Sequence, residues 1–89
     1  MIWKYPLAMV SEQQISVPEG AEFLSVHPQR EEICVWALVY PASPKVKRGI
    51  RIIGTGHEFN ETELGRYIGT VHMRDGTLVL HVFEMARGG

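Results

Sequence analysis

The dipeptide Asp75-Gly76 constrains the fold of this 89-residue chain more than any other feature. It separates two runs, 66–74 and 77–85, in which apolar and polar residues largely alternate. Asp-Gly between such runs favours a two-residue type I′ turn, because both central residues of that turn have positive φ. We therefore expect an antiparallel hairpin, with the pairs Arg74–Thr77, His72–Val79 and Thr70–His81.

This register predicts a hairpin with two unlike faces, because side chains alternate along a strand. The first face is apolar and should lie on a core; it consists of Tyr67, Val71, Met73, Leu78, Leu80 and Val82. The second face is mixed and holds Ile68, Thr70, His72, Arg74, Thr77, Val79, His81 and Phe83. Its two histidines are diagonal neighbours.

The remainder of the chain consists of short apolar runs between prolines and glycines, which is typical of strands. We expect strands at 2–7, 13–17, 22–27, 33–40 and 50–53, and a basic loop at 45–48. The run 33–40 is apolar on both faces and should lie at the centre of the structure. Asn60 can cap a single helical turn near residues 60–64.

These elements predict an all-β fold: one small antiparallel barrel or sandwich of six to seven short strands, with that one helical turn. The domain should span residues 1–87, followed by a frayed tail at 88–89. A chain of this length has a thin core. Open sheet edges also need cover, so we expect a homo-oligomer.

Charge and cysteine content narrow the class of protein. Nine basic and ten acidic residues give a net charge of −1, whereas nucleic-acid binders are usually clearly basic. Cys34 is the single cysteine, so an internal disulfide is excluded and a reducing compartment is indicated. We find no run long enough to cross a membrane and no signal-peptide pattern, and we expect a cytoplasmic protein without membrane or nucleic-acid partners.

The segment Gly54-Thr55-Gly56-His57 is the strongest candidate binding site. Two glycines permit a sharp turn, and the N–H groups of residues 55–57 could form an anion-binding nest. Arg48 or Arg51, just upstream, could supply the counter-charge. The alternative is purely structural, with Gly54 as a bulge and Gly56 as a turn residue. The spacing matches neither a P-loop nor a dinucleotide fingerprint.

Thr70, His72 and His81 form a secondary candidate site on the mixed face of the hairpin. Two histidines without a third ligand do not make a metal site, and we expect neither a metal nor any other cofactor. No serine or acidic pair stands in a recognisable catalytic context. We therefore expect a protein that is not an enzyme.

Five segments in this order resemble a family of small phage and prophage proteins, a domain of unknown function. They are Trp3-Lys4-Tyr5-Pro6, Trp36-Ala37-Leu38-Val39, residues 54–57, Tyr67-Ile68-Gly69-Thr70 and His81-Val82-Phe83-Glu84. The likeness covers nearly the whole chain. Tyr40 stands where relatives often carry an acid. The resemblance implies an accessory protein in the cytosol of a host cell and supplies no catalytic residues.

Two functions from different classes fit these observations. The first is counter-defence by sequestering a small anionic, nucleotide-like ligand at Arg48, Arg51 and residues 54–57. The second is an inhibitor or adaptor that binds a host protein surface through the aromatic residues Trp3, Tyr5 and Tyr67. We favour the first because of the 54–57 segment.

Overall fold

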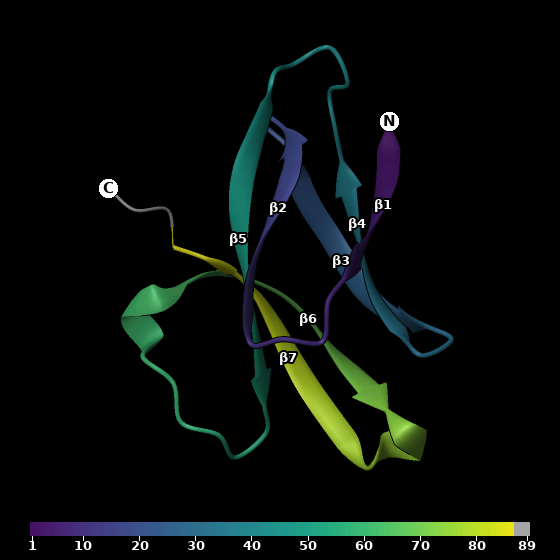
Figure 1. Cartoon of the computed structure of the whole chain (residues 1–89), viewed down its shortest axis with the longest axis vertical. Coiled ribbons are helices and arrows are strands. Elements are labelled where there is room, and N and C mark those ends of the chain that lie inside the picture. Colours follow the sequence, from purple (N-terminus) through teal and green to yellow (C-terminus); the bar gives the residue numbers. More distant parts are fainter. Residues whose placement is uncertain (87–89) are drawn as a thin grey trace.

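The computed structural model describes residues 1–86 and shows seven strands in two antiparallel sheets (Figure 1). The first sheet has the order β1-β4-β3 and the second has the order β2-β5-β7-β6. The strands are β1 (Ile2–Leu7), β2 (Glu12–Pro18), β3 (Glu22–Gln29), β4 (Glu32–Leu38), β5 (Lys45–Gly54), β6 (Leu64–Met73) and β7 (Leu78–Met85). The predicted all-β class is confirmed. The expected tail at 88–89, with residue 87, lies outside the described residues.

The two sheets pack on one shared core and do not close into a barrel, so the fold is a small sandwich. Every strand contributes to this core, with Val17 and Phe23 from β2 and β3, and Val35, Ile50 and Val82 from the middle strands. Strand β4 lies between β1 and β3, and Val35 and Ala37 are fully buried. The prediction that the apolar run from Ile33 is central is therefore confirmed, although the strand ends at Leu38.

The β6–β7 hairpin has the predicted register. His72 pairs with Val79 and Thr70 pairs with His81. The ladder ends at Met73 and Leu78, one pair earlier than expected, and the Thr77 N–H donates to the Arg74 carbonyl at 3.1 Å. Asp75 (φ 55°, ψ 33°) and Gly76 (φ 86°) have the positive φ of a type I′ turn. Residues 74–76 are also wound into a short 3₁₀ turn, η2 (Arg74–Gly76), which the sequence did not indicate.

The predicted faces of β6 are wrong at Tyr67 and Ile68. The register shifts between Leu64 and Tyr67 and again between Tyr67 and Gly69. Because a one-residue shift moves a side chain to the other face, Tyr67 lies on the outer face against the Phe83 ring, at 5.2 Å between ring centroids. Ile68 packs on the core instead.

The predicted basic loop at 45–48 is also wrong. These residues form the first part of β5, where Val46 pairs with Val17 and Lys47 pairs with Ser16. The alternation of Val46 and Arg48 with the two lysines is a strand pattern in which an arginine takes an inward position.

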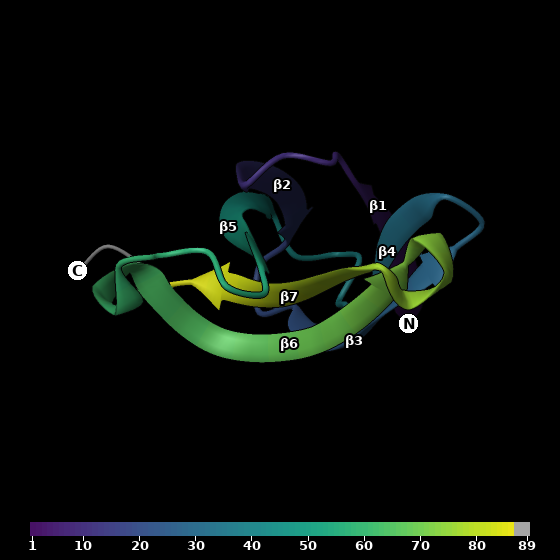
Figure 2. The ribbon, with the colours of Figure 1, turned by 90° about the horizontal axis from the view of Figure 1, so that it is seen from below.

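The two sheets approach each other most closely where β6 passes β3 (Figure 2). A Cβ placed on Gly69 would lie only 2.7 Å from Cγ1 of Val26. Real Cβ atoms do not approach a neighbour this closely, so glycine permits the contact between the sheets.

The predicted helical turn exists as η1 (Glu61–Glu63). The Asn60 side chain caps it by accepting hydrogen bonds from the N–H and the hydroxyl of Thr62, at 3.1 and 2.7 Å. Within residues 1–86 there is no helix long and apolar enough to cross a membrane.

Candidate functional site

A hollow lies beside the 54–57 turn, and we call it the turn pocket. It has a volume of about 560 Å³. Three segments form it: the β1–β2 connection, the end of β5 with the turn, and the start of β7. Its lining consists of Met9, Val10, Ser11, Ile52, Gly54, Thr55, His57, Thr77, Leu78, Val79 and Leu80.

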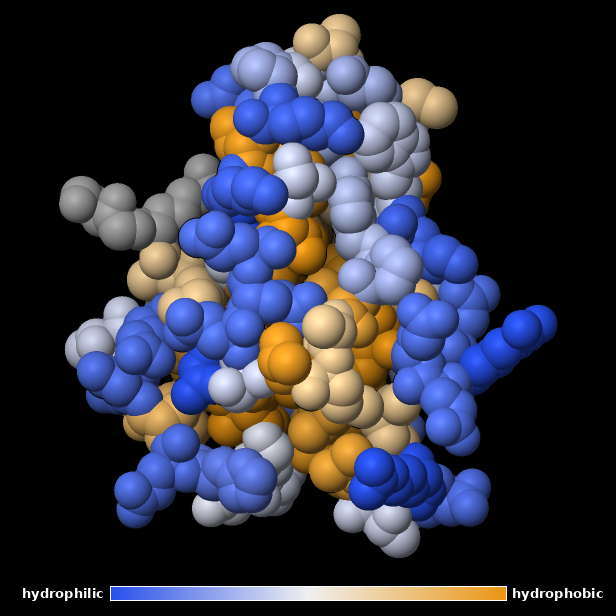
Figure 3. All heavy atoms as spheres, in the orientation of Figure 1, coloured by the Kyte–Doolittle hydropathy of each residue, from blue (hydrophilic) through white to orange (hydrophobic). Residues whose placement is uncertain are grey.

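The turn pocket has an apolar interior and a polar rim. Ile52 and Leu80 belong to the core, and Leu78 packs against it. Ser11, Thr77 and His57 are exposed residues at its edge. Figure 3 shows hydrophobic atoms gathered over the middle of this face, where the β1–β2 connection crosses β7 in Figure 1. Such a surface suits a ligand with an apolar body and a few polar groups.

Residues 54–57 form a tight turn rather than an anion nest. The His57 N–H donates to the Gly54 carbonyl at 3.0 Å, and the Thr55 N–H donates to the Val79 carbonyl at 3.2 Å. Gly56 has φ 88°, which a side chain rarely adopts. Two of the three N–H groups expected to bind an anion are therefore already used inside the protein.

The ring of His57 folds back over Gly54. A Cβ at position 54 would lie 3.1 Å from both Cε1 and Nδ1 of that ring. Glycine at this position therefore lets the imidazole approach the strand end closely. A ring able to donate and accept hydrogen bonds thus lines the turn pocket.

Arg48 lies away from the turn pocket, in the interior of the sandwich, and is 6 % exposed. Its Nε contacts Oε2 of Glu84 at 2.5 Å, and its Nη1 donates to the Ala21 carbonyl at 2.9 Å. The guanidinium also lies over the Phe23 ring. It is thus held by protein groups and does not serve the 54–57 turn as a counter-charge.

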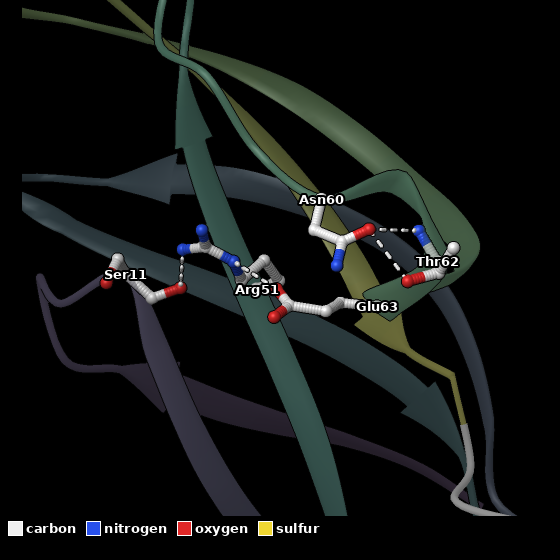
Figure 4. A network of polar contacts seen from close by, with 5 residues as sticks. All are labelled: Ser11, Arg51, Asn60, Thr62 and Glu63. Carbon is white, nitrogen blue, oxygen red and sulfur yellow. Dashed lines mark hydrogen bonds and ion pairs between the residues drawn. The ribbon is translucent and has the colours of Figure 1, made fainter.

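Arg51 lies on the outer face of the second sheet and joins two surface segments (Figure 4). Its Nη1 donates to the Ser11 carbonyl at 3.0 Å, and its Nε lies 3.7 Å from Oε2 of Glu63 in η1. Because Ser11 lines the turn pocket, Arg51 positions one wall of that pocket without lining it. Gly56 does not line it either.

The secondary candidates separate into two groups. His81 lies between two hydroxyls, with Nε2 at 2.7 Å from Thr55 Oγ1 and Nδ1 at 3.0 Å from Thr70 Oγ1. The Thr70 hydroxyl also forms a hydrogen bond with the hydroxyl of Tyr67. These hydrogen bonds connect the 54–57 turn to the hairpin. His72, in contrast, is exposed and lines a different hollow. Within residues 1–86, no three His, Cys, Asp or Glu side chains are grouped closely enough to hold a metal ion.

Sequence reasoning missed the apolar half of the turn pocket. Met9 and Val10 are exposed large hydrophobic residues in a connection between two strands. Two large apolar side chains exposed next to each other in this short connection are the signal that could have indicated a surface function. That this connection and β7 line the same pocket could not be read from the sequence.

Fold and site define a small antiparallel β-sandwich with one open, mostly apolar pocket beside a glycine turn. The chain belongs to the family of a domain of unknown function, DUF7352, whose sequence profile matches residues 1–89. The expected membership of an unknown-function family is confirmed, and a phage origin stays a prediction. No curated protein and no solved structure matches the chain.

Proposed function

We propose that this protein is a non-enzymatic binding protein that captures a small anionic, nucleotide-like ligand, with the apolar or ring part of the ligand in the turn pocket. The observation that carries the proposal is the pocket itself. At about 560 Å³ it falls within the roughly 300–1,000 Å³ of small-molecule sites. Its apolar interior and polar rim fit a flat ring with polar substituents.

The 54–57 turn contributes shape and one side chain to this site. Gly54 and Thr55 form part of the wall, and His57 lies at the rim. The hydrogen bond between Thr55 and His81 holds the turn against β7. A wall that is already in place before the ligand arrives lowers the entropic cost of binding.

The proposal retains the setting that the sequence predicts. As a phage-type accessory protein in the host cytosol, the protein would sequester a signal molecule of the host defence. A homo-oligomer would cover edge strands β1 and β2. The alternative, an inhibitor or adaptor that binds a host protein, is less favoured because Trp3 and Tyr5 pack against the core, leaving Tyr67 as the exposed member of the three expected anchors.

Binding of 8-anilinonaphthalene-1-sulfonate (ANS), a ring system with one anionic group, tests the proposal. We expect the folded wild type to bind it with enhanced fluorescence. Val10→Asp introduces a charge on the pocket wall and should weaken binding about tenfold, the order expected for losing one buried aliphatic contact. Leu24→Asp is the matched control, because Val10 and Leu24 are 49 % and 43 % exposed.

The control variant should bind ANS as the wild type does. Absence of binding to the folded wild type, or equal binding by Val10→Asp and wild type, would reject the turn pocket as the site. Circular dichroism on each sample shows that the dye is reporting on folded protein.

A further inference from the structure

A second hollow adjoins the turn pocket, and we call it the arginine hollow. It has a volume of about 420 Å³ and lies between the β3–β4 turn of one sheet and the tip of the β6–β7 hairpin of the other. Four charged side chains line it, Arg30, Glu31, Arg74 and Asp75, together with His72. It therefore differs in chemistry from the apolar turn pocket.

Neither arginine of this hollow forms an ion pair with a carboxylate within residues 1–86. The ion pairs within residues 1–86 are Arg48–Glu84, Arg51–Glu63 and Arg66–Glu22. Arg30 and Arg74 belong to none of them, although Glu31 and Asp75 lie in the same hollow. Both arginines thus line the hollow without an ion-pair partner within residues 1–86.

The backbone conformation at positions 30 and 74 does not explain why arginine stands there. Arg30, Arg74 and Asp75 have φ values of 59°, 50° and 55°, and they are the residues other than glycine with positive φ within residues 1–86. Asparagine and glycine adopt such φ values at lower cost than arginine. Arginine therefore stands in two turns that favour other residues, and both turns line the same hollow.

The two hollows meet at one side chain. Met9 of the β1–β2 connection lines both the turn pocket and the arginine hollow. It is 53 % exposed, unbranched and flexible. The two hollows are therefore adjacent, and the side chain that they share adapts readily.

We propose that Arg30 and Arg74, with His72 beside them, form the anion-binding part of the ligand site. The apolar body of the ligand lies in the turn pocket, and its phosphate, sulfonate or carboxylate group is bound by the two guanidinium groups. This inference rests on the proposed function and supplies the counter-charge that Arg48 and Arg51 do not. Because Glu31 and Asp75 balance the two arginines in number, recognition depends on directed hydrogen bonds rather than on net charge.

The test compares two dyes with the same ring system. ANS carries a sulfonate, and N-phenyl-1-naphthylamine is its uncharged counterpart. Arg30→Asn combined with Arg74→Asn removes both guanidinium groups while keeping a residue that accepts positive φ, so the variant should fold. Arg66→Asn is the control, because Arg66 is an exposed arginine on β6 that contacts Glu22 at 3.5 Å.

We expect the double variant to bind ANS about tenfold more weakly, as for loss of a charge-assisted hydrogen bond, and to bind N-phenyl-1-naphthylamine as the wild type does. Arg66→Asn should leave both affinities unchanged. Unchanged ANS affinity in the double variant, with Val10→Asp still weakening both dyes, would overturn the arginine site and leave the turn pocket standing. Failure of the wild type to bind either dye would reject both.

Discussion

Arg48 and Glu84 form an ion pair inside the sandwich, and their side chains are 6 % and 11 % exposed. Arg48 comes from β5 and Glu84 from the neighbouring β7. The same guanidinium reaches the carbonyl of Ala21 before β3 and stacks on Phe23. One arginine therefore links the second sheet to the start of the first.

Replacing Arg48 by methionine should cost about 3–5 kcal/mol in the free energy of unfolding, because the buried Glu84 carboxylate loses its ion pair with Arg48. Urea denaturation measures this cost. Lys47→Met is the control on the adjacent, exposed position of β5 and should change stability by less than about 0.5 kcal/mol. A loss below 1 kcal/mol for Arg48→Met would contradict a structural role for the ion pair.

Gly69→Ala should destabilise the protein by about 1–3 kcal/mol, the usual cost of overpacking. The added Cβ would meet Val26 at 2.7 Å, where the two sheets touch. Val26→Ala removes the clashing atom, so the double variant should lose less than the sum of the two single losses. Strict additivity in this double-mutant cycle would show that the two positions are not in contact.

His81→Leu should loosen the 54–57 turn while leaving the strand intact, because leucine lacks the bond to Thr55 but suits a strand. Amide hydrogen exchange at Thr55 and His57 should rise roughly fivefold, the factor for one hydrogen bond of about 1 kcal/mol. Exchange at Ile52, whose N–H donates to the Ser11 carbonyl, should not change.

Thr70→Val is the control for this experiment, because it removes the bond at Nδ1 of His81 and leaves the bond to Thr55. If Thr70→Val accelerates exchange in the turn as much as His81→Leu does, the hydrogen bond between Thr55 and His81 is not what holds the turn.

Because the hydroxyl of Tyr5 is buried, we expect the folded protein to lose stability at alkaline pH. Burial raises the pKa of Tyr5 above its usual value of 10.0, and no hydrogen-bond partner for this hydroxyl lies within residues 1–86. Above pH 10 the unfolded chain releases this proton more readily than the folded protein does. The contribution of the protonated Tyr5 hydroxyl to the free energy of unfolding is therefore complete below pH 10. It is lost as the pH rises through the pKa that Tyr5 has in the folded state.

Tyr5→Phe should be as stable as the wild type at pH 7, or slightly more stable, because an unpaired buried hydroxyl is removed. Between pH 9 and 11 it should lose less stability than the wild type. Both curves come from urea denaturation, and Tyr40 and Tyr67 are present in both proteins. Parallel pH profiles would show that Tyr5 has the same pKa in both states.

The local signals in the sequence predicted local structure well. Asp75-Gly76 determined the hairpin register, and Asn60 marked the start of η1, because a turn and a cap depend on neighbouring residues. Tyr67 was placed on the wrong face because two register shifts in β6 interrupt the alternation. Bulges of this kind have no reliable sequence signature apart from Gly65 and Gly69 nearby.

The candidate site was predicted in part, because its members meet only in the folded chain. Gly54, Thr55 and His57 do line a pocket. Their amides were expected to be free, but Val79 of β7 accepts the Thr55 N–H. Arg48 was expected in a loop, and its partner Glu84 lies 36 residues later in the sequence. Arg30 and Arg74 were not expected at a site, because they stand far apart in the sequence and line one hollow only in the folded chain.

Native mass spectrometry after incubation with a bacterial small-molecule extract tests the central claim, ligand capture in the turn pocket, most directly. Our account predicts an added mass of a few hundred daltons on the wild type and on Leu24→Asp, absent from Val10→Asp, and released unchanged on denaturation. No added mass on the wild type, equal loading of Val10→Asp, or release of a chemically altered molecule would contradict it.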